Sequence, residues 1–568
     1  MHQQQQLGAS LRDNFDAVVG SLPPAMTAGE RARVRAATPM SPSMALLQEL
    51  GPLDRVGART ADGRRLRRHA IKGAVVAFVT AGYSGKRFIF EKAKELGVRA
   101  IILDASDSWA QLLVEEGVAE KFVPIDFSDA DTVFEQCLKG VKGAAAAMGG
   151  AAIDGVTTFC ELAVPLVSRL AEALGLPANS PASVDAARDK YMTRAAMAQA
   201  GLPTPRNSRV STPADIEPAG LHVGFPAVIK PVSGAASIGV VRVNDMAALH
   251  EAYHRVARDM SRARVVAGAL VEGGDEGEEE EEAAALEAAA EAAAAATAAA
   301  AAAAAKADGG DGAPPLPPAA AKARAATPSK TGASAWIKVE LMLEEYLDGP
   351  EVDCDLVLSQ GQCVYGAVTD NWPTVEPYFN ETGSNCPSLL PRDQQRALLD
   401  LSVASVRALG LKEGVFHVEA KMTTRGARLI EVNCRMGGGP VRDTNLLVWG
   451  VDLVEEHLMT AAGIPARPTI ARRPLVNMAE YSINADRSGV LERDDFLHAW
   501  AAHPDVLYAR ALAKAGERVV CVADGLPTWV CELMVVKPRV EEAIAFVKSI
   551  EAAISPLPIK PVPARPAK

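Results

Sequence analysis

The sequence predicts an α/β protein of several domains, on three observations. The chain has 568 residues, which at about 150 residues per domain allows three or four domains. An apolar run at 73–79, a helical pattern at 88–96 and a second apolar run at 100–103 follow one another with glycines between them. Strand, helix and strand in this order form a βαβ unit with a parallel sheet. Further strand and helix patterns alternate along the rest of the chain.

Composition and charge argue against a nucleic-acid partner and against a membrane span. The net charge is −11, but twelve acidic and four basic residues lie between Val271 and Ala333. The rest of the chain is therefore near neutral and has no basic face for nucleic acid. Outside an alanine block, in which 19 of the 23 residues at 283–305 are alanine, apolar runs are short or interrupted. A transmembrane helix is not expected.

The cysteines indicate the compartment. Eight cysteines are present without a C-x-x-C pair or a regular framework, which is typical of reduced thiols in an intracellular protein. The cytoplasm is therefore the predicted location. Residues 1–70 are rich in arginine but are interrupted by acidic residues. We expect a variable N-terminal extension there and leave organelle targeting open.

Changes in composition divide the chain into segments. The βαβ pattern occupies 71–180, and the main set of strand and helix patterns occupies 181–545. Residues 272–333 are of low complexity, acidic at first and then alanine-rich, and they have no apolar face with which to join a core. We expect this insert to carry no function. The proline-rich tail at 555–568 is expected to be disordered.

The most informative segment is a predicted hairpin across residues 414–433. Its turn is centred on Arg425, so Glu419 opposes Glu431, and directly opposed like charges destabilise a sheet. Asn433 lies two residues further on and projects from the same face. Two carboxylates and an amide oxygen suit Mg²⁺ or Mn²⁺. Two solvated acids on an exposed face are the alternative, which the apolar strands around them weaken.

A glycine-rich turn follows this hairpin directly. Arg435 precedes three glycines, of which Gly438 is the middle one, and glycine lets the backbone approach a ligand closely. The forked guanidinium of Arg435 can hold a carboxylate or a phosphoryl oxygen. A surface arginine in a loop is the alternative.

A second pattern, typical of phosphate binding, precedes the insert. Lys230 ends a predicted apolar strand, and the loop that follows contains the small residues Ser233, Gly234, Ser237 and Gly239. Backbone N–H groups of such a loop can surround phosphates, with the lysine as a point charge. A common small-residue turn is the alternative. Lys190, on a helix predicted over 185–202, is a weaker candidate whose alternative is a solvated lysine.

A polar turn at 343–351 joins the end of one predicted strand to the start of the next. Its backbone groups, around Glu344, Glu345 and Leu347, can bind the edge of an adenine. Glu351 can accept hydrogen bonds from both hydroxyls of a ribose. Taken alone, the segment is a turn.

Together these motifs resemble the ATP-grasp superfamily, in the order that this superfamily shows. The residues that carry the resemblance are Ala187–Pro205, Phe225–Pro231, Glu344–Glu351, and Glu419 with Glu431–Asn433. The resemblance implies an ATP-grasp fold with an N-terminal Rossmann-like pre-ATP-grasp domain and a small lid domain at about 205–343, which contains the insert. It also implies that the two lysines, the glycine-rich loop and the 344–351 turn bind ATP, and that Glu419, Glu431 and Asn433 bind the metal.

Within the superfamily, the sequence resembles carnosine synthase and related amino-acid ligases over residues 344–355, 369–390 and 431–456. This resemblance implies an ATP- and Mg²⁺-dependent ligase that joins small amino-acid substrates through an acyl-phosphate. Carnosine synthases are considerably longer, so histidine and β-alanine are not assumed to be the substrates. Small molecules are the expected partners, and a homo-oligomer is left open.

The resemblance also implies roles for single residues. Lys230 and Arg435 would act in catalysis, by offsetting phosphate charge and by stabilising an oxyanion. Glu381 would bind a substrate amino group, and Arg435 and Gly438 would contact the substrate. Two other functions stay open. A biotin-dependent carboxylase shares the fold, although no Met-Lys-Met carrier motif is present. A non-catalytic ATP-binding module would bind nucleotide without amino-acid-stimulated hydrolysis.

Overall fold

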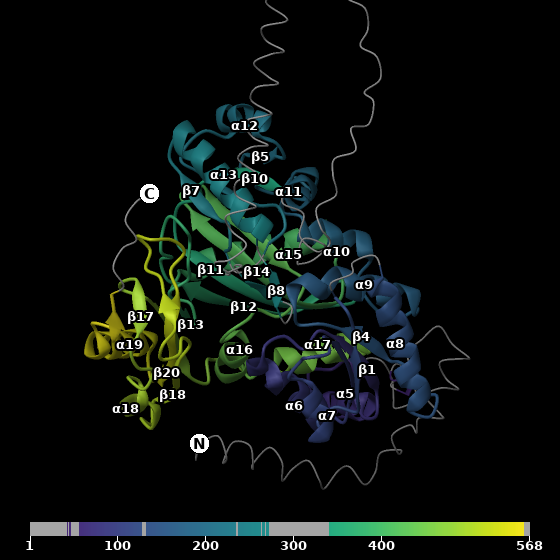
Figure 1. The fold of residues 1–568 in the computed structure, drawn as a ribbon. Helices are drawn as coiled ribbons and strands as arrows, with labels where there is room; N and C mark the ends of the chain where they lie inside the picture. Colours follow the sequence, from purple (N-terminus) through teal and green to yellow (C-terminus); the bar gives the residue numbers. More distant parts are fainter. Residues whose placement is uncertain are drawn as a thin grey trace, which may run out of the picture.

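The computed structural model describes residues 43, 45–46, 56–127, 132–234, 237–262, 264–266, 269–271 and 340–561. The insert expected at 272–333 and most of the extension expected at 1–70 lie outside these residues. Figure 1 shows a central sheet with a lobe at the top, an N-terminal lobe at the lower right and a C-terminal lobe at the lower left. The protein is an α/β protein, as the sequence predicts.

The N-terminal lobe contains the predicted βαβ unit. Its sheet has the strand order β3-β2-β1-β4, and the paired strands are parallel. Strand β1 is buried along its whole length because its alternate residues enter two cores: Phe78 packs with Phe90, and Val79 packs with Leu170. Helices therefore cover both faces, as a parallel sheet requires. The elements are β1 (Val75–Val79), α6 (Arg87–Glu95), β2 (Arg99–Asp104), β3 (Lys121–Pro124), α8 (Val133–Ala147), β4 (Gly155–Thr157) and α9 (Val164–Ala173).

The lobe begins earlier than the sequence predicts. Helix α5 (Ala61–Ile71) starts at Thr60, whose side chain accepts a hydrogen bond from the Gly63 N–H. Leu66 in this helix is 1% exposed and belongs to the core. The prediction of an extension at 1–70 is therefore wrong for residues 61–70. These arginine-rich residues form an amphipathic helix.

The top lobe is a four-stranded antiparallel sheet in the order β5-β10-β6-β7. Its strand β10 comes after the insert in sequence and pairs with two strands that precede it. Ile216, Ile229 and Leu249 share the core between this sheet and two helices. The elements are β5 (Asn207–Val210), α12 (Ile216–Val223), β6 (Ala227–Pro231), β7 (Val241–Val243), α13 (Met246–Arg262) and β10 (Leu341–Glu345).

The central sheet has eight strands in the order β15-β14-β11-β12-β13-β16-β20-β18, and its neighbouring strands are antiparallel. Phe416 points into the core with α15, whereas Val415 points into the core with α17, as alternation along a strand requires. The elements are β11 (Glu351–Ser359), β12 (Gln362–Asn371), β13 (Gly383–Cys386), α15 (Arg392–Ala408), β14 (Gly414–Thr423), β15 (Gly426–Asn433), α17 (Leu453–Ala461), β16 (Asn477–Asn484), β18 (Val506–Ala511), β20 (Trp529–Lys537) and α19 (Val540–Ile554).

Two further expectations are corrected. The single helix predicted over 185–202 is two helices, α10 (Pro181–Arg188) and α11 (Lys190–Gln199). Asp189 between them is extended, and its side chain accepts a hydrogen bond from the Met192 N–H, so a helix N-cap interrupts the periodic pattern. The tail is also ordered at its start, because β21 (Ile559–Lys560) pairs with β17 (Gly489–Leu491).

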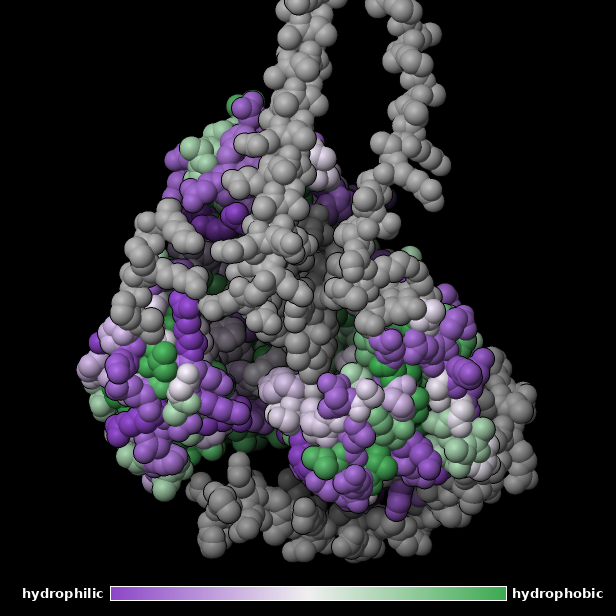
Figure 2. All heavy atoms as spheres, viewed as in Figure 1, coloured by the Kyte–Doolittle hydropathy of each residue, from purple (hydrophilic) through white to green (hydrophobic). Residues whose placement is uncertain are grey.

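On the face of the molecule shown in Figure 2, hydrophilic and hydrophobic residues are interspersed over the described parts of the three lobes, and neither kind forms one large patch there. No helix in the described part of the chain has the length and apolar character that crossing a membrane requires.

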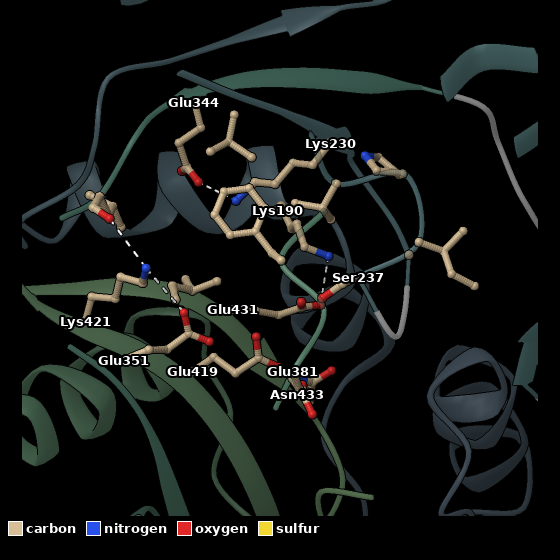
Figure 3. A pocket seen from close by; sticks show the side chains of 18 of the residues that line it. Lys190, Lys230, Ser237, Glu344, Glu351, Glu381, Glu419, Lys421, Glu431 and Asn433 are labelled. Carbon is tan, nitrogen blue, oxygen red and sulfur yellow. Dashed lines mark hydrogen bonds and ion pairs between the residues drawn. The ribbon is translucent and has the colours of Figure 1, made fainter. Parts of the chain in front are cut away.

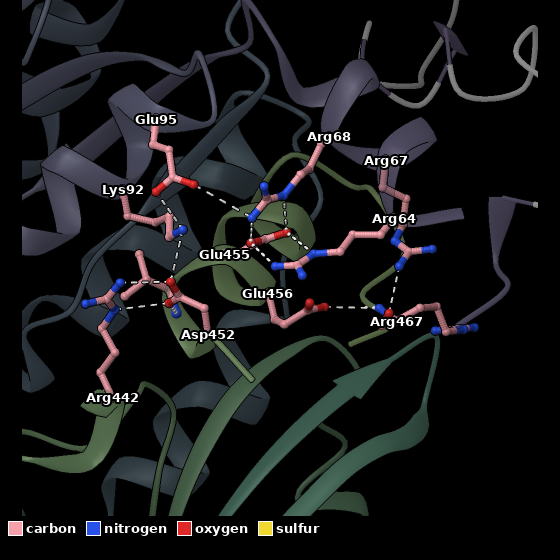
Figure 4. A network of polar contacts seen from close by, with 11 residues as sticks. Arg64, Arg67, Arg68, Lys92, Glu95, Arg442, Asp452, Glu455, Glu456 and Arg467 are labelled. Atoms are coloured by element: carbon pink, nitrogen blue, oxygen red, sulfur yellow. Dashed lines mark hydrogen bonds and ion pairs between the residues drawn. The ribbon is translucent and has the colours of Figure 1, made fainter. Parts of the chain in front are cut away.

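A network of buried ion pairs joins the N-terminal lobe to α17 (Figure 4). Arg64 and Arg68 of α5 both pair with Glu455, whose side chain is 2% exposed. Asp452, at the N-terminus of α17, pairs with Arg442 and with Lys92 of α6. Because Asp452 and Glu455 both receive pairs from helices of the N-terminal lobe, α17 and its N-cap hold this lobe against the central sheet.

The two neighbouring acids Glu455 and Glu456 should give opposite pH dependences of stability. Burial, together with the charge of Glu455, raises the pKa of Glu456 to about 8. Its unfolded pKa is about 4.3, so between these values the folded chain holds a proton that the unfolded chain has released, and stability falls as pH rises. Glu456→Gln removes this loss. We expect its melting temperature, relative to that of the wild type, to increase between pH 5 and pH 9.

Glu455→Gln is the matched control. Burial alone would raise the pKa of Glu455, but Arg68 and Arg64 hold it well below its usual range. This carboxylate therefore contributes stability above pH 4.3 or so, which is lost only as pH falls. Glu455→Gln should melt below the wild type across the whole range from pH 5 to pH 9. Equal pH profiles for the two variants would contradict the assignment.

Candidate functional site

One pocket lies between the top lobe and the central sheet and gathers most of the predicted residues (Figure 3). Its lining includes thirteen of them: Lys190, Lys230, Gly234, Ser237, Glu344, Glu345, Leu347, Glu351, Glu381, Glu419, Glu431, Asn433 and Arg435. Three predicted residues, Ser233, Gly239 and Gly438, are not among the described lining residues. Motifs that lie more than 200 residues apart in the sequence thus meet in one place.

Glu419 and Glu431 are opposite each other, as predicted, but the hairpin that brings them together differs from the expected one. Strands β14 and β15 are joined with Thr423 opposite Gly426, so the turn is centred half a residue earlier than Arg425. Continued without interruption, this register would place Glu419 opposite Ile430. A β-bulge shifts it by one residue at this point, and Glu419 opposes Glu431. A bulge next to a site is a common way to re-aim a side chain.

The two carboxylates have different surroundings. Glu431 Oε1 accepts a hydrogen bond from Lys190 Nζ at 2.9 Å. Burial would raise the pKa of Glu431, but the charge and hydrogen bond of Lys190, together with the charges of Arg188 and Lys230, hold it below its usual value. Burial, followed by the charge of Glu431, raises the pKa of Glu419 to about 8. Asn433 Nδ2 donates to Glu419 Oε1 at 3.3 Å, so the third predicted ligand lies beside the pair, as expected.

The donor set fits a divalent cation. Among the described residues, no cluster of three His, Cys, Asp or Glu side chains forms a metal site, so the candidate set consists of two carboxylates and one amide. Glu419 is half-buried and forms no ion pair with a lysine or arginine of the described chain, and burial followed by the charge of Glu431 raises its pKa. A hard cation would supply positive charge here and prefers oxygen ligands. Glu419, Glu431 and Asn433 would therefore hold it.

Lys230 is fixed by a buried ion cluster. Glu344, opposite Val228 on the neighbouring strand, pairs with both Lys230 and Arg194. Burial alone would raise the pKa of Glu344, but Arg194 and Lys230 hold it down to about 2. The Glu344 side chain thus orients Lys230, a role that the turn at 343–351 did not suggest.

Arg194 connects this cluster to the hairpin. Its Nη2 donates to Glu344 Oε2 at 3.2 Å and to the carbonyl oxygen of Ile430 at 2.6 Å. Ile430 is the residue that the bulge leaves out of register. Arg194 is 1% exposed, and sequence analysis missed it. Arg194 lies four residues after Lys190 on α11, so both side chains are on one face of the helix. This spacing is the sequence feature from which Arg194 could have been predicted.

The expected adenine and ribose residues line the pocket on another side. Glu345 pairs with the exposed Arg206 and Arg425, and its backbone N–H donates to the carbonyl oxygen of Arg206 at 2.8 Å. Glu351 lies 3.4 Å from Lys421 Nζ, and burial raises the pKa of Glu351. Lys421 was also missed, although it lies two residues after Glu419 on the same face of β14.

Glu381 lies on the acidic side of the pocket, near the carboxylate pair (Figure 3). Burial, followed by the charges of Asp353 and Glu351, raises its pKa to about 7. Its carbonyl oxygen accepts hydrogen bonds from Trp529 Nε1 at 2.8 Å and from Asn484 Nδ2 at 3.2 Å. The C-terminal lobe therefore holds this residue in place.

Arg435 lines the pocket beside the metal candidates. Its Nη1 donates to the carbonyl oxygen of Met436 at 2.9 Å, and its Nη2 donates to Asn433 Oδ1 at 3.3 Å. In the glycine turn, a side chain at Gly437 would collide with His417 at 2.7 Å, whereas one at Gly438 would meet open space among the described residues. Gly437 is thus required for packing against His417, whereas the close approach of the turn to a ligand stays a prediction.

The other two predicted residues outside the lining have local roles. Ser233 Oγ donates to the carbonyl oxygen of Arg188 at 3.1 Å, which ties the glycine-rich loop to the end of α10. Gly239 has a positive φ of 75°, a conformation that favours glycine, so it allows the loop to turn into β7.

Comparison with known families defines the class of protein. Residues 90–178 match an ATP-grasp N-terminal domain, and residues 223–279 with 319–443 match an ATP-grasp domain. The chain therefore contains ATP-grasp domains, and these matches confirm the predicted resemblance to the ATP-grasp superfamily.

Individual relatives narrow the resemblance. The chain is 28% identical over 422 residues to carnosine synthase 1 of Homo sapiens, covering 72% of this chain and 42% of that protein. It is 25% identical over 312 residues to alanine–anticapsin ligase of Bacillus subtilis, covering 54% and 53% of the two chains. The chain spans about two fifths of the length of the carnosine synthases that it matches.

A solved structure shows the same fold. L-amino acid ligase from Bacillus licheniformis superposes with a TM-score of 0.62 at 21% sequence identity, over 85% of this chain and 98% of that one. The predicted resemblance to carnosine synthases and L-amino-acid ligases is confirmed.

The buried ion cluster gives a test with an internal control. Glu344→Gln leaves Lys230 and Arg194 buried without their carboxylate, and breaking a buried pair costs about 3–5 kcal/mol. Glu345→Gln, one residue later, loses only pairs with exposed arginines and should cost less than about 1 kcal/mol. Denaturation by urea, followed by circular dichroism, measures both. Similar losses for the two variants would refute the role assigned to Glu344.

Proposed function

We propose that the protein is an ATP- and Mg²⁺-dependent ligase that joins the carboxylate of one small amino acid to the amine of another. The observation that carries this proposal is the polarity of one pocket. Lys230 and the glycine-rich loop line it from the top lobe, the Glu419–Glu431 pair and Arg435 line it from the hairpin and the turn after it, and Lys190 contacts Glu431 between them. The relatives that ligate amino acids support the choice of substrates.

The proposed reaction has two steps. An oxygen of the first substrate's carboxylate attacks the γ-phosphorus of ATP, the bond to the β-γ bridging oxygen breaks, and ADP leaves. The nitrogen of the second substrate then attacks the acyl carbon, phosphate leaves, and the nitrogen loses a proton. Such catalysis consists mainly of positioning and charge neutralisation. A divalent cation, Mg²⁺ or Mn²⁺, bound by Glu419, Glu431 and Asn433 would offset phosphate charge.

The chain's own residues have distinct parts in these steps. Lys230, held by Glu344, and Lys190, held by Glu431, would bind the phosphates as fixed charges. Arg435 would stabilise the oxyanion of the tetrahedral intermediate, because a planar fork can grip two oxygens. Glu381 would bind a substrate ammonium group. The 345–347 backbone and Glu351 would bind the adenosine.

The domain organisation fits this scheme. We assign residues 71–180 to a pre-ATP-grasp domain, to which α5 is added, and residues 181–545 to the ATP-grasp domain. Residues 205–343 form its lid, which would exclude water from an acyl-phosphate. A cytoplasmic location and small-molecule partners complete the proposal.

A phosphate-release screen over pairs of amino acids with ATP and Mg²⁺ tests the function. Release that requires two amino acids, together with a dipeptide detected by mass spectrometry, is the expected result. Release that requires bicarbonate instead would indicate a carboxylase. ATP binding without stimulated release by any pair would indicate a non-catalytic module.

Glu431→Gln tests the metal ligands. The variant removes one of two carboxylates, so Mg²⁺ should bind more weakly and half-maximal ligation should require more Mg²⁺, since each carboxylate contributes charge to the site. Activity is titrated against Mg²⁺ at fixed ATP. A titration that coincides with that of the wild type would remove Glu431 from the site.

Arg435→Lys should impair the chemical step far more than nucleotide binding. Lysine keeps the charge but loses the fork, and loss of one oxyanion donor typically costs about 10²–10³-fold in kcat. An interaction made only in the transition state lowers kcat and kcat/KM together. Steady-state kinetics and a separate ATP titration measure these quantities. A normal kcat with lost ATP affinity would make Arg435 a phosphate ligand instead.

A further inference from the structure

A buried acid of the N-terminal lobe reaches the ATP-grasp pocket. Glu161 follows β4 in a short 3₁₀ turn, Glu161–Ala163, and is 5% exposed. Its Oε2 lies 2.7 Å from Arg435 Nε, and its Oε1 accepts a hydrogen bond from Arg188 Nη1 at 3.0 Å. One carboxylate thus contacts two arginines from different parts of the chain. Sequence analysis singled out neither Glu161 nor Arg188.

The contact with Arg435 acts on its orientation. Oε2 of Glu161 has no aligned hydrogen-bond donor among the described residues, so the contact with Nε is an ion pair. The two terminal nitrogens of Arg435 each donate one hydrogen bond, to Met436 and Asn433. Each terminal nitrogen carries two N–H groups, so within the described chain one on each remains for a ligand in the pocket. Glu161 contacts Nε of Arg435 and so leaves both terminal nitrogens to other partners.

The contact with Arg188 reaches the glycine-rich loop. Arg188 Nη1 also donates to the carbonyl oxygen of Gly234 at 3.4 Å, and Lys190 N donates to the carbonyl oxygen of Val232 at 3.0 Å. The loop that would surround the phosphates is therefore tied to the end of α10, and α10 is tied to Glu161. The same carboxylate holds both the loop and Arg435.

We propose that Glu161 is a positioning residue for ligation. It orients the guanidinium of Arg435 toward the reacting carboxyl group, and through Arg188 it fixes the position of that guanidinium relative to the glycine-rich loop. The N-terminal lobe is then part of the active site. This inference rests on the proposed function, because it takes Arg435 to act on the substrate.

Glu161→Gln keeps the size of the side chain and removes its charge. We expect kcat to fall by about 10- to 100-fold, the range found when the partners that orient metal-binding groups are removed. The KM for ATP should stay within a few-fold of the wild type. Glu161→Asp, which keeps the charge, should retain more activity than Glu161→Gln. Asp185→Asn, which breaks an exposed pair with Arg169 nearby, is the control and should behave as the wild type.

A double variant separates positioning from an independent role. If Glu161 acts through Arg435, then Glu161→Gln combined with Arg435→Lys should be no slower than Arg435→Lys alone, because residues that act as a unit are not additive. Multiplied losses would overturn the proposal. A loss of thermal stability in Glu161→Gln with normal kcat would reduce Glu161 to a structural residue and would overturn it too.

A spectroscopic measurement decides the geometry without any substrate. In ¹⁵N NMR of the arginine guanidinium groups, the signals of Arg435 are identified by their loss in Arg435→Lys. A fork held by Glu161 should show separate signals for its two terminal nitrogens, and these should merge in Glu161→Gln as rotation becomes free. Unchanged signals in Glu161→Gln would refute the proposal. If no amino-acid pair stimulates the wild type, the proposed function fails, and this measurement still decides the position of Arg435.

Discussion

The buried guanidinium of Arg194 is the contact on which the geometry of the pocket depends. It pairs with Glu344, which also pairs with Lys230, and it donates to the carbonyl oxygen of Ile430 at the bulge. The first contact positions Glu344, which in turn orients Lys230, and the second supports the shift in register that sets Glu431 opposite Glu419. Breaking a buried pair leaves an uncompensated charge. Strand β10, helix α11 and the carboxylate hairpin are therefore held by one side chain.

The sequence predicted the contents of the site well, because each motif is local. A strand followed by small residues, a polar turn between strands, and an acid and an amide two residues apart on one face can all be recognised from local patterns. The hairpin shows the limit of such reasoning. The turn is centred half a residue before Arg425 and the bulge lies at Ile430. The expectation that Glu419 faces Glu431 was met because these two departures from a regular hairpin cancel.

What the sequence could not predict are contacts between distant segments. Arg194 and Glu344 are 150 residues apart, Arg64 and Glu455 are 391 apart, and Glu161 and Arg435 come from different lobes. No periodicity connects such pairs. The arginines of α5 are an example: the sequence placed them in a variable N-terminal extension, whereas two of them neutralise one buried acid. A charge run indicates solvent only when no buried partner exists.

The packing of α17 explains how a residue of the N-terminal lobe can serve a site in another domain. A side chain at Gly155 in β4 would collide with the carbonyl oxygen of Ala461 at 2.3 Å, so strand and helix are in backbone contact. Thr157 Oγ1 lies 2.8 Å from His457 Nε2, and α17 also packs on β14, the strand that carries Glu419. The lobe, the helix and the hairpin therefore form one rigid unit at this point. Because interiors are close-packed, this packing holds Glu161 in contact with Arg435 although the two residues belong to different domains.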